Sequence, residues 1–106
     1  MLLIVSACAK PQIENKSGII LFYGDGCPHC GNVEAFIKEH NLTEKIQFDQ
    51  LEVFNNKDNS VVFAEKAGIC QIPQEKLGVP LLWDGANCVE GDQNIIKFFK
   101  DKLDEK

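Results

Sequence analysis

Two cysteines separated by two residues, Cys27 and Cys30, are the part of the sequence best suited to chemistry. They follow an apolar run and precede a segment with helical periodicity. Thiols at this spacing on the first turn of a helix are close enough to form a disulfide. The helix dipole and the unpaired N–H groups at the helix start stabilise a thiolate on the first of them. The spacing therefore predicts thiol–disulfide chemistry.

The four residues of this motif have different predicted roles. Cys27, at the predicted N-cap with an exposed sulfur, is the candidate nucleophile, and the more buried Cys30 would resolve a mixed disulfide by attacking the sulfur of Cys27. Pro28 suits the first helical position, where its missing N–H would have no partner. An imidazolium at His29 would stabilise the thiolate and make the disulfide a better oxidant. The alternative is that His29 is only an exposed polar residue.

Composition limits the class of protein. A chain of 106 residues with 44% hydrophobic and 25% charged residues fits one globular domain with a modest core. The formal net charge of −5 argues against nucleic acid or an anionic membrane surface as a partner. No stretch reaches the length of a membrane-spanning helix. We expect a monomer that needs no cofactor and binds no metal.

The first part of the chain is predicted to be separate from the folded domain. Residues 1–17 are expected to form an arm or tether and residues 18–104 the domain. An apolar run and small residues before Cys8 resemble the lipobox of bacterial lipoproteins, but the run is short and no basic residue precedes it. Either the natural start lies upstream of Met1, or the match is accidental and Cys8 is a buried apolar residue. A membrane is a predicted partner only if Cys8 is lipidated.

Periodicity and turn signals predict the elements that position the motif. Continuous apolar runs predict buried strands, helical spacing of apolar residues predicts helices, and Asp84 followed by Gly85 predicts a hairpin turn. The expected strands are 19–23, 46–54, 79–83 and 88–90, and the expected helices are 28–40, 58–67 and 92–103.

The boundaries of three of these elements carry specific expectations. The alternation slips within 46–54, which suggests a bulge or a strand shorter than the run. Gly68 is a plausible end of the second helix, since glycine is favoured just after a helix. Asp92 can cap the third helix with its carboxylate.

The resulting order, β-α-β-α-β-β-α, predicts an α/β fold with a four-stranded mixed sheet and helices on both faces. This order, with C-P-x-C at the first strand-to-helix junction, resembles the glutaredoxin and thioredoxin superfamily over about residues 18–103, at the size of a glutaredoxin. The resemblance implies a thiol–disulfide oxidoreductase that acts on protein or small thiol and disulfide substrates and needs a partner to recycle Cys27 and Cys30.

A second match lies just before the third strand, at Val79 and Pro80. The superfamily places a cis-proline there, facing the active-site cysteines, so the resemblance implies a cis bond and pairing of the Val79 backbone with the substrate chain. Pro-His between the cysteines and valine before the proline are similar to the disulfide-forming DsbA family, which implies an oxidising direction. The alternatives are a reducing cytoplasmic glutaredoxin or thioredoxin-like protein, and a non-catalytic metal- or iron–sulfur-binding module that uses the same cysteines.

Two departures from glutaredoxins concern glutathione. Glutaredoxins bind it partly through a basic residue just before the first cysteine, where this chain has only residues of the turn 24–26, two glycines and an aspartate. At the start of the last helix, Gly91 and Asp92 match only part of a second glutathione contact. The sequence therefore makes glutathione a doubtful partner.

The remaining cysteines of the domain are Cys70, before the third strand, and Cys88, in the fourth. The hairpin could bring them together, and if Cys8 is lipidated the other four form two pairs. A Cys70–Cys88 disulfide would be structural, would contribute about 2–4 kcal/mol and would indicate an oxidising compartment. Two buried free thiols are the alternative. We expect an extracytoplasmic location, periplasmic or membrane-anchored in a bacterium, in preference to the cytoplasm.

Overall fold

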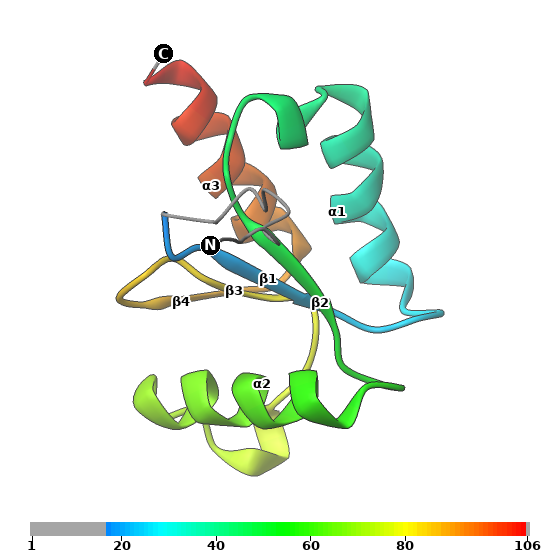
Figure 1. Cartoon of the computed structure of the whole chain (residues 1–106), viewed down its shortest axis with the longest axis vertical. Coiled ribbons are helices and arrows are strands. Elements are labelled where there is room, and N and C mark those ends of the chain that lie inside the picture. The colour runs from blue at the N-terminus through cyan, green and yellow to red at the C-terminus, as the bar shows by residue number, and fades with distance from the viewer. Residues whose placement is uncertain (1–16, 106) are drawn as a thin grey trace, which may run out of the picture.

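A computed structural model describes residues 17–105 of the chain (Figure 1). One sheet is covered by helices on both of its faces, with α1 and α3 on one side and α2 on the other (Figure 1). Two short 3₁₀ helices follow α1 and α2. The elements are β1 (Ile20–Tyr23), α1 (Pro28–Glu39), η1 (Leu42–Glu44), β2 (Asp49–Glu52), α2 (Lys57–Ile69), η2 (Gln74–Lys76), β3 (Leu81–Trp83), β4 (Cys88–Glu90) and α3 (Asp92–Asp104).

The sheet is mixed, as predicted. Its strand order is β2-β1-β3-β4. The pair β1–β2 is parallel, whereas β1–β3 and β3–β4 are antiparallel. The helix α1 connects the two parallel strands, and β3 and β4 form the predicted hairpin. These observations confirm the α/β fold with a four-stranded mixed sheet.

The central strand β1 is buried on both faces, which explains its continuous apolar sequence. Leu21 is 3% exposed and packs into a core with α1 and α3, where Phe99 is fully buried. Phe22, next along the strand, is also fully buried and faces the opposite core, against Phe63 of α2 at a ring distance of 5.2 Å. The strand that leads into α1 is therefore fixed by a hydrophobic core on each face of the sheet.

Two predicted strands are shorter than their apolar runs. The strand β2 covers only Asp49–Glu52, the shorter of the two outcomes expected from its broken alternation. The strand β3 begins at Leu81 and not at Val79. Pro80 has no N–H to donate to the strand pairing, so the ladder starts after it.

The prediction that Gly68 ends the second helix is wrong. The helix α2 continues through Gly68 to Ile69, and Cys70 is its C-cap. The left-handed conformation that glycine would provide instead falls on Gln71, at φ 60°. The N–H of Ile72 then bonds to the carbonyl of Ala67 at 3.0 Å, which closes the helix end. The local preference for glycine was overridden because Cys70 is tied to the sheet.

The prediction that Asp92 caps the third helix is also wrong by one residue. Gly91 is the N-cap, at φ 88°, and Asp92 is the first residue of α3. A positive φ of this size favours glycine, which has no Cβ to clash. The carboxylate of Asp92 is therefore free to point toward another element.

Two further predictions concern the N-terminal arm and membrane-spanning helices. The arm of residues 1–17, and with it Cys8, lies outside the described residues except for Ser17, so its boundary and its lipidation stay predictions. Within residues 17–105, no helix combines the length and the apolar character that a membrane crossing requires.

Candidate active site

Cys27 occupies the N-cap of α1. The strand β1 ends at Tyr23, and a turn in which Gly26 has φ 79° leads into the cysteine. Cys27 itself is extended, and the N–H of Cys30 donates a hydrogen bond to its sulfur at 3.1 Å. Pro28 is the first helical residue, as predicted from its missing N–H. An anion on the Cys27 sulfur would thus meet a backbone donor and the positive end of the helix dipole.

The two motif cysteines lie one helical turn apart and are paired as a disulfide. Their Cα atoms are 5.2 Å apart. Cys27 is partly exposed, whereas Cys30 is only 6% exposed and belongs to the buried side of α1. The sulfur of Cys27 is therefore the more accessible of the two to a molecule that arrives from solvent.

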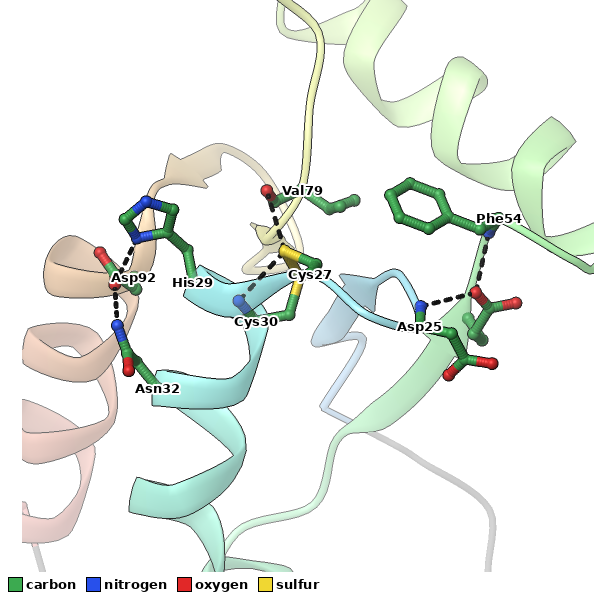
Figure 2. The surroundings of a disulfide bond; sticks show 9 residues. Asp25, Cys27, His29, Cys30, Asn32, Phe54, Val79 and Asp92 are labelled. Carbon is green, nitrogen blue, oxygen red and sulfur yellow. Dashed lines mark hydrogen bonds and ion pairs between the residues drawn. A yellow bond between two sulfur atoms is a disulfide. The ribbon is translucent and has the colours of Figure 1, made fainter.

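The segment before β3 lies against Cys27, although it is 52 residues away in the sequence (Figure 2). The sulfur of Cys27 is 3.7 Å from the carbonyl oxygen of Val79. The Val79–Pro80 peptide bond is cis, and Pro80 is buried. Backbone of the Val79 segment therefore borders the sulfur that a substrate would reach.

His29 is turned toward the start of α3 (Figure 2). Its Nδ1 lies 3.0 Å from Oδ2 of Asp92, and the side-chain amide of Asn32 donates to the same oxygen at 2.7 Å. The Asn32 hydrogen bond, followed by that of His29, holds the pKa of Asp92 below its ordinary value. The Asp92 carboxylate therefore holds the His29 imidazole, whose side chain is 73% exposed, at the start of α3.

Glu52, at the end of β2, binds two loops at once through its carboxylate. One oxygen, Oε2, accepts the N–H of Asp25 and the N–H of Phe54, each at 3.0 Å. The other, Oε1, accepts the N–H of Asn55 at 2.9 Å. The Asp25 N–H contributes most to lowering the pKa of Glu52. This group, which we call the Glu52 clamp, joins the turn before Cys27 to the loop between β2 and α2.

The side of the site near the Glu52 clamp is acidic. Burial is the main cause of a raised pKa at Tyr23, and the carboxylates of Asp25 and Glu52 raise it further. Negative charge therefore gathers at the end of β1, directly before the N-cap cysteine. An anionic substrate would be repelled on this side.

The Glu52 clamp predicts a pH-dependent stability. The pKa of Glu52 is lowered on folding from an ordinary value of 4.5. Its contribution is therefore fully present above that value and is lost as the pH falls through the lower folded-state pKa. We expect Glu52→Gln to lower the free energy of unfolding at neutral pH, and the difference from wild type to shrink at an acidic pH well below 4.5.

Urea unfolding of both proteins at the two pH values measures this effect. Asp101→Asn is the matched control, because the Asp101 carboxylate pairs with Lys97 across one exposed helical turn of α3, at 3.1 Å. A difference between wild type and Glu52→Gln that is the same at both pH values would contradict the role of the Glu52 clamp.

The second cysteine pair lies on the far side of the sheet from α1. Cys70, at the end of α2, and Cys88, in β4, are joined as a disulfide with Cα atoms 6.2 Å apart. Both are partly buried in the core beneath α2, near Trp83. Of the two alternatives left by the sequence, the structure has the disulfide. The closed loop contains the Val79–Pro80 segment of the site.

Metal ligation is the alternative use of these cysteines. Among residues 17–105, no three or more His, Cys, Asp or Glu side chains are grouped so that they could hold a metal ion. The four cysteines of this region form two pairs, one on each side of the sheet.

The structure adds three residues to those predicted from the sequence. These residues are Asn32, Glu52 and Phe54. Asp92 belongs to the site because its carboxylate contacts His29, and it does not cap α3. For Glu52 a signal was present, because it ends the strand parallel to β1, and the carboxyl ends of parallel strands meet at one sheet edge. The contacts of Asn32, Phe54 and Asp92 had no such signal.

The four-stranded mixed sheet, with a central strand that leads into the C-x-x-C at the start of α1, gives the chain a glutaredoxin-like fold. Solved glutaredoxins are similar to this chain. Wheat glutaredoxin is 16% identical with a TM-score of 0.55, and the match covers 84% of this chain and 75% of that one. Glutaredoxin 1 from Francisella tularensis is 22% identical with a TM-score of 0.53, over 83% of this chain and 96% of that one.

A third similar structure, oxidized glutaredoxin 2 from Chlamydomonas reinhardtii, is 13% identical with a TM-score of 0.54, over 86% of this chain and 78% of that one. At these identities the likeness establishes the fold. No protein-family model and no curated protein sequence matches the chain. Together, the fold and the Cys27–Cys30 pair support a thiol–disulfide oxidoreductase in general.

Proposed function

We propose that this protein is a thiol–disulfide oxidoreductase that works in the oxidising direction, with Cys27 as the sulfur attacked by substrate. The observation that carries the proposal is the position of the Cys27 sulfur. It is partly exposed at a helix N-cap, accepts the N–H of Cys30, is paired with Cys30, and borders the Val79 carbonyl. Thiolate stabilisation at this position makes Cys27 a good leaving group.

The exchange proceeds in two balanced steps. A substrate thiolate attacks the Cys27 sulfur, the Cys27–Cys30 bond breaks, and the Cys30 thiolate leaves with the electron pair and takes up a proton. A second substrate thiolate then attacks the substrate sulfur of the mixed disulfide, and Cys27 leaves as a thiolate. The substrate loses two electrons and gains a disulfide, while the protein becomes a dithiol. A second protein that carries a redox-active disulfide would reoxidise it.

Two observations support a protein thiol in an oxidising compartment as the substrate. The Cys70–Cys88 disulfide is of the kind that persists outside a reducing cytosol. Asp92, which partly matches a glutathione contact in glutaredoxins, already accepts hydrogen bonds from Asn32 and from His29 when that nitrogen is protonated. We therefore propose polypeptide cysteines in an extracytoplasmic compartment as substrates, in preference to glutathione.

The reduction potential of the Cys27–Cys30 pair tests the direction. A value near about −120 mV would support disulfide formation, and one near about −270 mV would make the protein a reductant and overturn the oxidising role. Equilibration against a reference dithiol of known potential, followed by thiol trapping and mass spectrometry, gives this value. The same preparation should transfer its disulfide to a reduced dithiol peptide.

Variants of His29 and Asp92 should move the potential in opposite directions. His29→Ala removes an imidazole whose cationic form would stabilise the Cys27 thiolate, so the reduced form loses stabilisation and the potential becomes more negative. Asp92→Asn removes the carboxylate that would balance this cationic form, so the potential becomes less negative. Each shift is expected to be on the order of 30 mV, the equivalent of 1.4 kcal/mol for two electrons.

The potentials of wild type and of both variants should be measured under the same conditions. Lys38→Ala on the outer face of α1 is the control, since Lys38 meets only Glu34 there. Shifts of the same sign for both variants would contradict a charge effect of His29 on Cys27.

A further inference from the structure

Three large apolar side chains in the described part of the chain are strongly exposed, and one of them lies at the site. Phe54 is 59% exposed, Val61 is 67% exposed and Ile69 is 57% exposed. Phe54 lies in the loop between β2 and α2, whereas Ile69 ends that helix. Single exposed apolar residues such as Val61 and Ile69 are common on protein surfaces. Phe54 differs from them because it lies at the site.

The Phe54 ring packs on the turn that presents Cys27. A Cβ atom added to Gly24 would overlap three atoms of this ring, so the ring covers the α carbon of Gly24. The carbonyl of Gly24 in turn accepts the N–H of Cys27 at 3.2 Å. Figure 2 shows the ring directed from its loop toward the side where Cys27 and Val79 lie.

The backbone that carries the ring is held to the same turn. The Oε2 atom of Glu52 accepts the N–H groups of both Phe54 and Asp25. The Glu52 clamp therefore fixes the base of the Phe54 side chain relative to the active-site turn. An aromatic ring held in this way offers apolar surface to a ligand at a small cost in conformational entropy.

We propose that Phe54 is a specificity-determining residue that selects extended polypeptides with an apolar side chain next to the reacting cysteine. This inference rests on the proposed function. The substrate backbone would lie along Val79 while its apolar side chain covers the exposed face of the Phe54 ring. The carboxylate of Glu52, which accepts the Phe54 N–H, and the nearby charge of Asp25 favour neutral or basic segments over acidic ones.

Two reduced dithiol peptides test the inference, identical except for leucine or serine next to the first cysteine. The oxidised protein is mixed with each peptide, the reaction is quenched with acid, and the rate constant for disulfide transfer is obtained by chromatography. Wild type is expected to prefer the leucine peptide by about tenfold, which equals 1.4 kcal/mol. Partial burial of a leucine side chain provides a free energy of this size.

The preference, not the absolute rate, is the informative quantity. Phe54→Ala should lower the ratio of the two rate constants to about one, and Phe54→Leu should restore most of it, because an aliphatic surface returns. Ile69→Ala is the matched control, since Ile69 is exposed to a similar extent at the opposite end of α2, and it should keep the tenfold ratio.

Equal rate constants for the two peptides in wild type, or an unchanged ratio in Phe54→Ala, would overturn the inference while leaving the proposed function intact. Absence of transfer to either peptide would overturn the proposed function instead. Circular dichroism and urea unfolding of each variant establish that the folded proteins are compared.

Discussion

Replacing Cys27 with serine should reduce disulfide transfer by at least about a thousandfold, to the rate of exchange without protein. A hydroxyl oxygen cannot form the disulfide with Cys30, so the variant has no bond for a substrate thiolate to break. The remaining thiol, Cys30, is only 6% exposed and would react slowly. The rate of transfer to a reduced dithiol peptide, followed by chromatography, measures the loss.

Cys30→Ser is the matched variant because it removes the same number of thiols and keeps the exposed sulfur. With Cys27 first converted to a mixed disulfide by a small disulfide reagent, this variant should pass that group to a substrate thiolate. It should also form a stable adduct with a disulfide substrate, because no second thiol can resolve it. Transfer by Cys27→Ser at the wild-type rate would contradict the proposed function.

Removal of the second disulfide should have the largest effect on stability. We expect the double substitution Cys70→Ala and Cys88→Ala to lower the free energy of unfolding by about 3 kcal/mol, since the bond closes a loop over a sequence separation of 18. For a domain of this size the midpoint of thermal unfolding should fall by roughly 12–24 °C. Urea and thermal unfolding without reductant measure both quantities.

The same measurement in the presence of a reductant is the control. Reduction opens the Cys70–Cys88 bond in wild type, so the difference between wild type and the double variant should become much smaller. A variant as stable as oxidised wild type would show that the bond adds nothing to the fold.

Patterns that depend on neighbouring residues predicted most of the fold. The apolar run before Cys27 predicted β1, and Pro28 predicted the start of α1. Asp84 and Gly85 predicted the hairpin. The start and end of β4 also agree with the prediction. These features are local, since strand burial, the missing proline N–H and turn residues act on adjacent positions.

The wrong predictions arose where a distant contact competed with a local preference. Gly68 could end a helix, but α2 runs past it to Cys70, which is bonded to Cys88 in β4. Asp92 could cap a helix, but its carboxylate faces His29 and Asn32 of α1. In both cases packing of one element on another decided the outcome, at positions where the local preference is worth only about 1 kcal/mol.

The sequence by itself determined the redox motif, the exposed and buried roles of its two cysteines and the fold class, because C-x-x-C spacing and helix-start geometry are local properties. Only the tertiary structure decided what surrounds the sulfur of Cys27. Val79 lies 52 residues away along the chain, and Asp92 lies 63 residues from its partner His29. Such contacts depend on strand order and on helix packing across the sheet, which bring side chains together at distances that no sequence period encodes.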